Sequence, residues 1–215
     1  MAAAVPVTEI AYITLKPGIE LEGSGTAAQA WKETLTTVSQ QDGYQRMHWG
    51  RTLEDPNQLM LFIDWDSRDA HLKFVATPGY TPFKNRLGSI MEGVHLHHVA
   101  FSPFPPSILG RAPVIEFATF FGTSDVFLSH VEKFMGAAGK PEGYHGSVYG
   151  PSVEDDVGKH ADGGDKGKAV VLLIGWDNVE AHMKFRETEG FQKNIGLLED
   201  GAKSAEMVHV AFTAV

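Results

Sequence analysis

The sequence repeats itself with an offset of 111 residues. Residues 65–74 (WDSRDAHLKF) align with residues 176–185 (WDNVEAHMKF). Over residues 65–101 this alignment needs no gap and contains 13 identities in 37 positions. Because the chain has 215 residues, a repeat at this offset predicts two copies of one structural unit.

The two copies differ by an insertion. Upstream of the gap-free region the offset falls from 111 to 100 residues, so the second copy has gained 11 residues. We place the insertion at residues 151–168, which are rich in Gly and Asp and are expected to form a mobile surface loop. The proline-rich residues 102–107 are expected to be a linker. We therefore expect a first domain at residues 1–106 and a second at residues 107–215.

The polarity pattern predicts the same element order in each copy. Residues 8–15 alternate with the period of a strand, and residues 26–41 carry an apolar stripe at helical spacing. Two strands, a helix interrupted at Pro78-Gly79 and a last strand follow. The expected elements are 8–15, 26–41, 44–52, 58–65, 66–91 and 95–101 in the first copy, and 115–121, 124–138, 145–149, 170–176, 178–198 and 208–214 in the second.

This β-α-β-β-α-β order is the ferredoxin-like arrangement. Both helices would cover one face of a four-stranded antiparallel sheet, which leaves the other apolar face bare. A second, identical sheet is the simplest cover for that face. We therefore predict an α+β fold in which two tandem ferredoxin-like repeats pack sheet to sheet as an intrachain pseudo-dimeric barrel.

Composition excludes several functional classes. With 27 acidic and 18 basic residues, the net charge of −9 disfavours binding to nucleic acids and to anionic membrane surfaces. The absence of cysteine excludes disulfides and thiolate chemistry. The sequence carries no signal-peptide pattern and no apolar run of roughly 18 residues, so we expect a cytoplasmic protein. Composition does not decide whether the protein forms a homodimer.

The residues that follow the third strand resemble a known signature. Residues 62–67 (FIDWDS), then Ala70-His71 and Phe74, are similar to the motif of the dimeric α+β barrel superfamily, especially its antibiotic-biosynthesis-monooxygenase and stress-responsive branches. The resemblance implies cofactor-free oxygenation, cyclisation or a lyase step on aromatic or polyketide-like substrates, although haem-degrading and non-catalytic members also exist. A plant cyclase of the superfamily has its catalytic histidine where this chain has Tyr80.

Polar residues present in only one copy are candidates for a working site. Asp64 lies in an apolar strand and needs a partner, for which His48 on the next strand is a candidate. Such a pair would orient an imidazole as a base, with Tyr80 as a proton donor; alternatively Asp64 caps the next helix. His48, Asp64, Tyr80 and His97 align with Val148, Gly175, Phe191 and Val208.

The shared histidines His71 and His182 are either bases or residues that define a helix start. We predict a site in the first copy with catalytic and substrate-binding residues. The predicted catalytic residues are His71, Tyr80, His48 and Asp64, and the predicted substrate-binding residues are Trp65, His98, Phe62 and Tyr44.

We expect no cofactor and no metal ion. His95 and His97 share one strand face, but a third ligand is not evident. The first hypothesis is an enzyme of secondary metabolism that acts on a small apolar or aromatic substrate by cofactor-free acid/base chemistry. The alternatives are a non-catalytic stress-responsive or ligand-binding barrel and, third, haem binding through His71 or His98.

Overall fold

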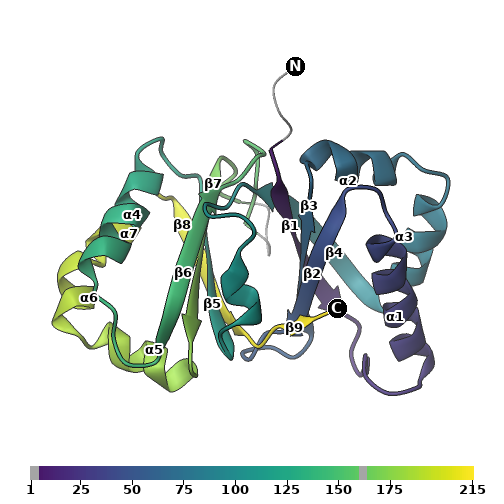
Figure 1. The fold of residues 1–215 in the computed structure, drawn as a ribbon, viewed down its shortest axis with the longest axis horizontal. Helices are drawn as coiled ribbons and strands as arrows, with labels where there is room; N and C mark the ends of the chain where they lie inside the picture. Colours follow the sequence, from purple (N-terminus) through teal and green to yellow (C-terminus); the bar gives the residue numbers. More distant parts are fainter. Residues whose placement is uncertain (1–4, 160–163) are drawn as a thin grey trace. The chain divides into compact units, whose positions relative to one another are not determined.

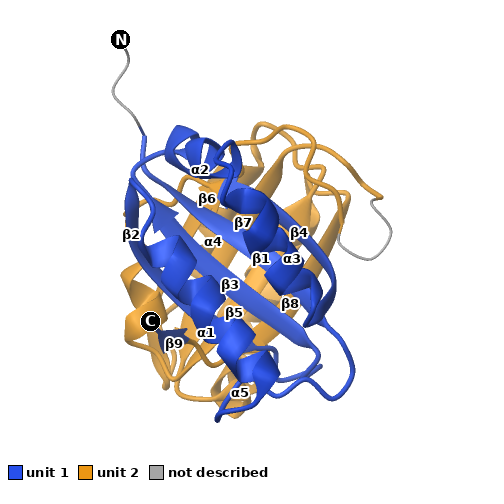
Figure 2. Ribbon diagram, turned by 90° about the vertical axis from the view of Figure 1, so that its right-hand side faces the viewer, with its two compact units in different colours: residues 1–98, 213–215 blue, residues 99–212 orange. Residues whose placement is uncertain are grey.

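The chain divides into two compact units (Figure 2). A computed structural model describes residues 5–159 and 164–215. Unit 1 comprises the chain up to residue 98 together with residues 213–215, and unit 2 comprises residues 99–212. Each unit has its own sheet and its own helices, so the predicted α+β class with two ferredoxin-like repeats is confirmed.

Unit 1 follows the predicted order of elements (Figure 1). Its elements are β1 (Val7–Leu15), α1 (Thr26–Ser39), β2 (Tyr44–Arg51), β3 (Gln58–Trp65), α2 (Arg68–Val75), α3 (Tyr80–Gly88), β4 (Met91–Val99) and, from the chain end, β9 (Thr213–Ala214). The strand order is β4-β1-β3-β2-β9. Strand β9 pairs with β2 through His48 and Trp49. The prediction of one strand over residues 208–214 is therefore wrong, because that segment ends one strand and forms another.

Unit 2 repeats the arrangement with the strand order β6-β7-β5-β8. Its elements are η1 (Ser107–Gly110), β5 (Val114–Phe121), α4 (Phe127–Ala137), β6 (Tyr144–Pro151), β7 (Ala169–Trp176), α5 (Val179–Arg186), α6 (Glu189–Asn194), α7 (Gly196–Glu199) and β8 (Ser204–Val210). Among the described helices of both units, none has the length and apolar character needed to cross a membrane.

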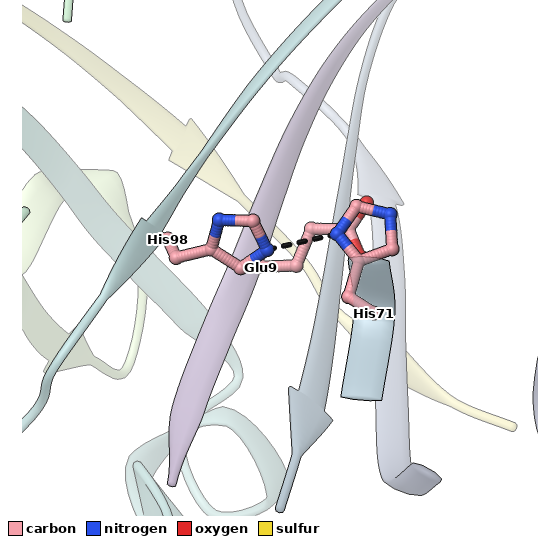
Figure 3. A group of neighbouring side chains, drawn as sticks. All are labelled: Glu9, His71 and His98. Carbon is pink, nitrogen blue, oxygen red and sulfur yellow. Dashed lines mark hydrogen bonds and ion pairs between the residues drawn. The ribbon is translucent and has the colours of Figure 1, made fainter. Parts of the chain in front are cut away.

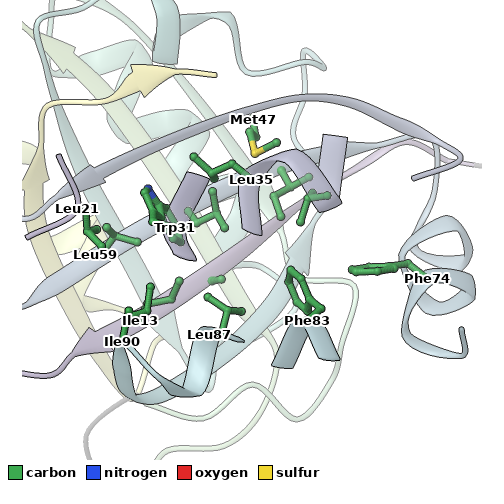
Figure 4. Packing of buried hydrophobic residues seen from close by; sticks show 14 of the residues in the cluster. Ile13, Leu21, Trp31, Leu35, Met47, Leu59, Phe74, Phe83, Leu87 and Ile90 are labelled. Carbon is green, nitrogen blue, oxygen red and sulfur yellow. The ribbon is translucent and has the colours of Figure 1, made fainter. Parts of the chain in front are cut away.

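The core of unit 1 lies between the sheet and its helices (Figures 1 and 4). Alternate residues of β3, such as Leu61 and Ile63, face α1 and α3, because side chains of a strand alternate between the two faces of a sheet. Trp31 of α1 and Phe83 of α3 pack against them. The Ser67 side chain accepts a hydrogen bond from the Ala70 amide at 3.2 Å and so starts α2 directly after β3.

The other face of the unit 1 sheet is also buried. Ile10 is 0% exposed, Phe62 is 1% exposed and Asp64 is 2% exposed. This burial removes apolar surface from water. The predicted sheet-to-sheet packing is not established by it and stays a prediction.

The insertion of the second copy is only partly a loop. Its first residue, Pro151, ends β6, and Ser152 forms a bridge with Val99. Val157 pairs with Gly167 and is only 7% exposed, so this part of the predicted surface loop is buried. Residues 160–163 of the predicted insertion lie outside the described residues.

Gly175 on β7 has a packing role. A Cβ atom at this position would lie 2.6 Å from the Cβ of Ala112 and 2.6 Å from the Cδ1 of Ile108. Gly175 aligns with Asp64 of unit 1, so this difference between the copies reflects the close approach of η1 to β7.

We expect Gly175→Ala to lower the free energy of unfolding by roughly 1–3 kcal/mol, because the added methyl group overpacks the contact with Ile108 and Ala112. Urea denaturation measures the change. Gly136→Ala is the control, since a Cβ atom there meets nothing within 4 Å and α4 should be stabilised by up to about 1 kcal/mol. Equal effects of the two substitutions would contradict the assignment.

Candidate functional site

Unit 1 contains a largely apolar cavity of about 260 Å³ between its sheet and helices α2 and α3. Polar groups from three elements enter it: Glu9 from β1, His71 from α2 and Tyr80 from α3. The apolar wall is formed by Ala11, Ile13, Val38, Leu61, Ile63, Trp65, Phe74, Phe83, Leu87, Met91, Val94 and Leu96, and Lys84 also lines the cavity. An apolar cavity with a few convergent polar groups is typical of a small-molecule site.

Glu9 is the centre of the polar cluster. It lies at the parity of Ala11 and Ile13 on β1, which directs its side chain to the helix-covered face of the sheet. One carboxylate oxygen, Oε2, accepts a hydrogen bond from the Trp65 indole N–H at 2.8 Å. The same oxygen lies 3.5 Å from Nδ1 of His71. The carboxylate is therefore held in place by one residue while it faces another.

His71 and His98 form a direct hydrogen bond. Nδ1 of His71 and Nε2 of His98 are 2.8 Å apart (Figure 3). Both imidazoles are buried, with exposed fractions of 5% and 2%. The His71 ring also stacks on Trp65, with centroids 5.5 Å apart. These contacts fix the orientation of a residue that lines the cavity, which is the requirement for a positioned acid or base.

Tyr80 is the first residue of α3 and lies at the aromatic end of the cavity. Its ring packs edge-on against Phe74 and stacks on Phe83, with centroids 5.2 and 5.6 Å away. Burial, and then the charge of Glu9, raise the pKa of the Tyr80 hydroxyl. The hydroxyl therefore keeps its proton at neutral pH and can act as a hydrogen-bond donor or an acid.

The predicted His48–Asp64 pair is wrong. Asp64 accepts a hydrogen bond from the Thr8 hydroxyl at 2.5 Å and forms an ion pair with Arg46. Arg46 faces Asp64 directly across the β2–β3 ladder, whereas His48 faces Phe62, and Asp64 is therefore satisfied without an imidazole. Burial, followed by the charge of Arg46, lowers the pKa of His48.

The structure separates the eight predicted site residues into two groups. His71, Tyr80 and Trp65 line the cavity, and His98 supports His71 from behind. His48, Asp64 and Phe62 lie on the opposite face of the sheet, because strand parity directs them away from the helices. Tyr44 packs edge-on against Trp65, with centroids 6.4 Å apart, and supports the cavity wall.

Residues 6–86 match the family model described as antibiotic biosynthesis monooxygenase. This part of unit 1 is therefore similar to an antibiotic biosynthesis monooxygenase domain. The matched residues include Glu9, His71 and Tyr80, whereas the wall residues Leu87, Met91, Val94 and Leu96 lie beyond the match. The sequence signature of the strand, tryptophan and helix thus led to the correct superfamily.

Solved structures similar to the whole chain share its fold at low sequence identity. An anthrone oxidase-like protein has 14% identity and a TM-score of 0.69, over 98% of this chain and 93% of its own. A candidate monooxygenase from Lactobacillus acidophilus has 12% identity and a TM-score of 0.61, over 98% and 96%. A candidate monooxygenase from Fusobacterium nucleatum has 11% identity and a TM-score of 0.63, over 100% and 95%. A comparison with curated proteins found no match.

Unit 2 retains the polar cluster of unit 1. Trp176 donates a hydrogen bond to Glu116 at 2.9 Å, and His182 bonds His209 at 2.8 Å. The cluster borders a second cavity of about 250 Å³. In that cavity Phe191 takes the place of Tyr80, so the hydroxyl group is missing. The second unit therefore has the same framework without the aromatic proton donor.

Burial dominates the electrostatics of the unit 2 cluster. It raises the pKa of Glu116 to about 7, against smaller opposing effects of the Trp176 hydrogen bond and of Arg186. Burial, then the charges of His209 and Arg186, lower the pKa of His182 to about 4. At neutral pH His182 is therefore a neutral imidazole.

Glu9 and Glu116 are cavity-lining carboxylates that the sequence interpretation missed. A signal was present, since each is an isolated carboxylate inside an otherwise apolar first strand, followed by an apolar residue and Ala. They are related by an offset of 107 residues, which differs from the offsets of 111 and 100 used elsewhere. A buried carboxylate needs a hydrogen-bonding or charged partner. The same need arises in the first strand of both copies, which identifies Glu9 and Glu116 as corresponding residues.

Proposed function

We propose that unit 1 is a cofactor-independent monooxygenase for a compact aromatic substrate that carries an acidic C–H or hydroxyl group. The convergence of Glu9, His71 and Tyr80 on one apolar cavity carries this proposal. The cavity, at about 260 Å³, lies just below the usual range for ligand pockets of roughly 300–1,000 Å³, which favours a small ligand. Such a role fits an enzyme of secondary metabolism that acts on polyketide-like aromatics.

The proposed reaction begins with removal of a proton by His71. The resulting carbanion or phenolate is electron-rich, so it can reduce dioxygen itself and needs no external electron donor. The carbon–oxygen bond then forms and gives a peroxide anion, which takes a proton from Tyr80. The Tyr80 phenolate then removes the second carbon-bound proton, the O–O bond breaks, and the leaving hydroxide takes the proton held by His71. CH₂ and O₂ are thereby converted into C=O and H₂O, and both residues return to their starting protonation states.

The surrounding residues have positioning roles in this scheme. His98 holds the His71 imidazole at 2.8 Å, and Glu9 lies 3.5 Å from the same ring nitrogen, where it stabilises the imidazolium that proton transfer creates. Trp65 donates to Glu9 and thereby fixes the carboxylate. The apolar wall excludes water, which strengthens these electrostatic interactions.

The family match of residues 6–86 supports an oxygenase over a cyclase or a lyase. The fold of the whole chain is shared with an anthrone oxidase-like protein. An anthrone contains an activated CH₂ group of the kind that the proposed reaction requires. Anthrone is therefore the first substrate to assay, and consumption of one dioxygen for each anthraquinone formed is the expected stoichiometry.

Replacing Tyr80 by Phe should lower the rate of oxygen consumption by roughly 10²-fold, because the peroxide anion loses its proton donor. An oxygen electrode with anthrone as substrate measures this rate. The control is Phe191→Tyr, the reciprocal change in unit 2, which adds a hydroxyl group to the second cavity and should not lower the rate. An unaltered rate for Tyr80→Phe would remove Tyr80 from the mechanism, and no oxidation of any acidic aromatic by the unmodified protein would overturn the proposed function.

A further inference from the structure

Three potential metal ligands converge in unit 1. One oxygen of Glu9, one nitrogen of His71 and one nitrogen of His98 all lie within 4.8 Å of one another (Figure 3). The same nitrogen of His71, Nδ1, is 2.8 Å from His98 and 3.5 Å from the Glu9 carboxylate. A single ring nitrogen therefore faces both of the other ligand atoms.

These separations are close to those around a bound transition-metal ion. With bonds of about 2.1 Å, neighbouring ligand atoms lie about 3.0 Å apart in octahedral geometry and about 3.4 Å apart in tetrahedral geometry. The separations of 2.8 and 3.5 Å from Nδ1 of His71 need changes of a few tenths of an ångström, and the third pair, Glu9 and His98, lies within 4.8 Å. Two imidazoles and one carboxylate form a set that binds Fe²⁺, Co²⁺ or Zn²⁺ and leaves further coordination positions open.

The structure around the three ligands is suited to such an ion. Glu9, His71 and His98 come from β1, α2 and β4, so the backbone of a folded unit holds them in position. Trp65 donates a hydrogen bond to Oε2 of Glu9, which is the kind of outer contact that orients a ligating carboxylate. Glu9 and His71 also line the cavity, so open coordination positions would face the space available to a ligand.

Unit 2 has the same three residue types in a different arrangement. Nδ1 of His182 bonds His209 at 2.8 Å, but it is the other ring nitrogen, Nε2, that lies 3.5 Å from Glu116. The two nitrogens of one imidazole point in different directions. The Glu116 carboxylate and His209 therefore lie next to different ring nitrogens of His182, and the three residues do not converge on one point.

We propose that Glu9, His71 and His98 form a binding site for one divalent transition-metal ion per chain, and that Glu116, His182 and His209 do not. This inference does not rest on the proposed oxygenase activity. A cation bound to Nδ1 of His71 would disfavour the imidazolium that proton transfer to this residue creates. A bound ion would therefore inhibit cofactor-free turnover through this base.

Titration with Co²⁺ tests the site without any activity measurement. The full-length protein, free of a histidine tag and treated with a chelator, is titrated while the visible absorption of Co²⁺ is followed. We expect one saturable equivalent with new absorption bands. His98→Ala should weaken binding by roughly 100-fold or more, whereas the matched His209→Ala should retain the wild-type affinity.

A second pair of variants covers the outcome in which His98→Ala does not fold, as judged by circular dichroism. His98→Asn and His209→Asn keep a hydrogen-bonding group of similar size, and the same difference in Co²⁺ affinity is expected. Failure of the wild-type protein to bind Co²⁺, binding of two equivalents, or equal losses in the paired variants would each overturn the proposal. Oxygen consumption measured with chelator present tests the proposed function separately.

Discussion

Replacing His71 by Gln is expected to lower the rate of anthrone oxidation by roughly 10²- to 10⁴-fold, the range for loss of a general base. Glutamine can still form a hydrogen bond to His98, but it cannot accept a proton at neutral pH. The loss should appear in kcat, because the apolar residues that form most of the cavity wall stay in place. Initial rates of oxygen uptake in the presence of a chelator measure the effect.

The second unit provides a matched control for this substitution. His182 shares two contacts with His71, a 2.8 Å bond to a strand histidine, His209, and a stacked contact to a tryptophan, Trp176, at 5.6 Å. His182→Gln should therefore cost similar stability and leave the oxidation rate unchanged. If both variants lose activity equally, the working site is not confined to unit 1. If neither loses activity, His71 is not the base.

The fold could be predicted from the sequence because the repeat shows the polarity pattern twice, together with the short motif at Trp65 and His71. Strand parity is also readable from the sequence, since alternation along residues 58–65 puts Asp64 on the same face as Met60 and Phe62, and the structure agrees. Partners across a sheet were harder to predict. Register selects Arg46 over His48 as the partner of Asp64, and a local bulge between Tyr44 and Arg46 is needed to set that register.

The candidate site was only half predictable for a related reason. His71, Tyr80 and Trp65 follow one another along the chain, so their convergence on one cleft can be inferred from local structure. Glu9 reaches the same cavity from a strand more than fifty residues earlier, and its partner is a tryptophan indole. Glu9 was also missed because polar residues present in only one copy were taken to mark the site, whereas both copies keep this carboxylate.

A carboxylate shared by both copies can be studied through stability, and Glu116 gives the clearest effect. Its pKa is about 7 in the folded protein, against an ordinary value of 4.5. The folded state therefore binds a proton that the unfolded state has lost between these pH values. This contributes stability that is fully present below pH 4.5 and is lost as the pH rises through 7.

His182 acts in the opposite direction over much of the same range. Its pKa falls from 6.5 to about 4 on folding, so its contribution to stability is present above pH 6.5 and is lost as the pH falls through 4. Between about pH 4.5 and 6.5 the folded cluster carries its proton on Glu116, and the unfolded chain carries it on His182. The two contributions to the pH dependence therefore oppose each other.

Glu116→Gln should remove the contribution of Glu116 to the pH dependence of stability and leave that of His182. The stability of the wild-type protein relative to the variant is expected to rise by up to about 3 kcal/mol between pH 7 and pH 4.5, since a pKa difference of this size corresponds to that free energy. The variant should therefore lose stability steeply as the pH falls through this range. Urea denaturation at several pH values measures the difference.

Glu180→Gln is the control, because Glu180 lies on the exposed side of α5, where its ion pair with Lys184 lowers its pKa. Glu180 is ionised in both the folded and the unfolded state across most of this pH range, so its substitution should shift stability by nearly the same amount at each pH. Parallel stability curves for wild type and Glu116→Gln would mean that the Glu116 carboxyl ionises normally in the folded protein. The proton that the cluster holds at pH 5.5 would then lie on His182. The imidazole would be charged, whereas we expect both Glu116 and His182 to be neutral at this pH.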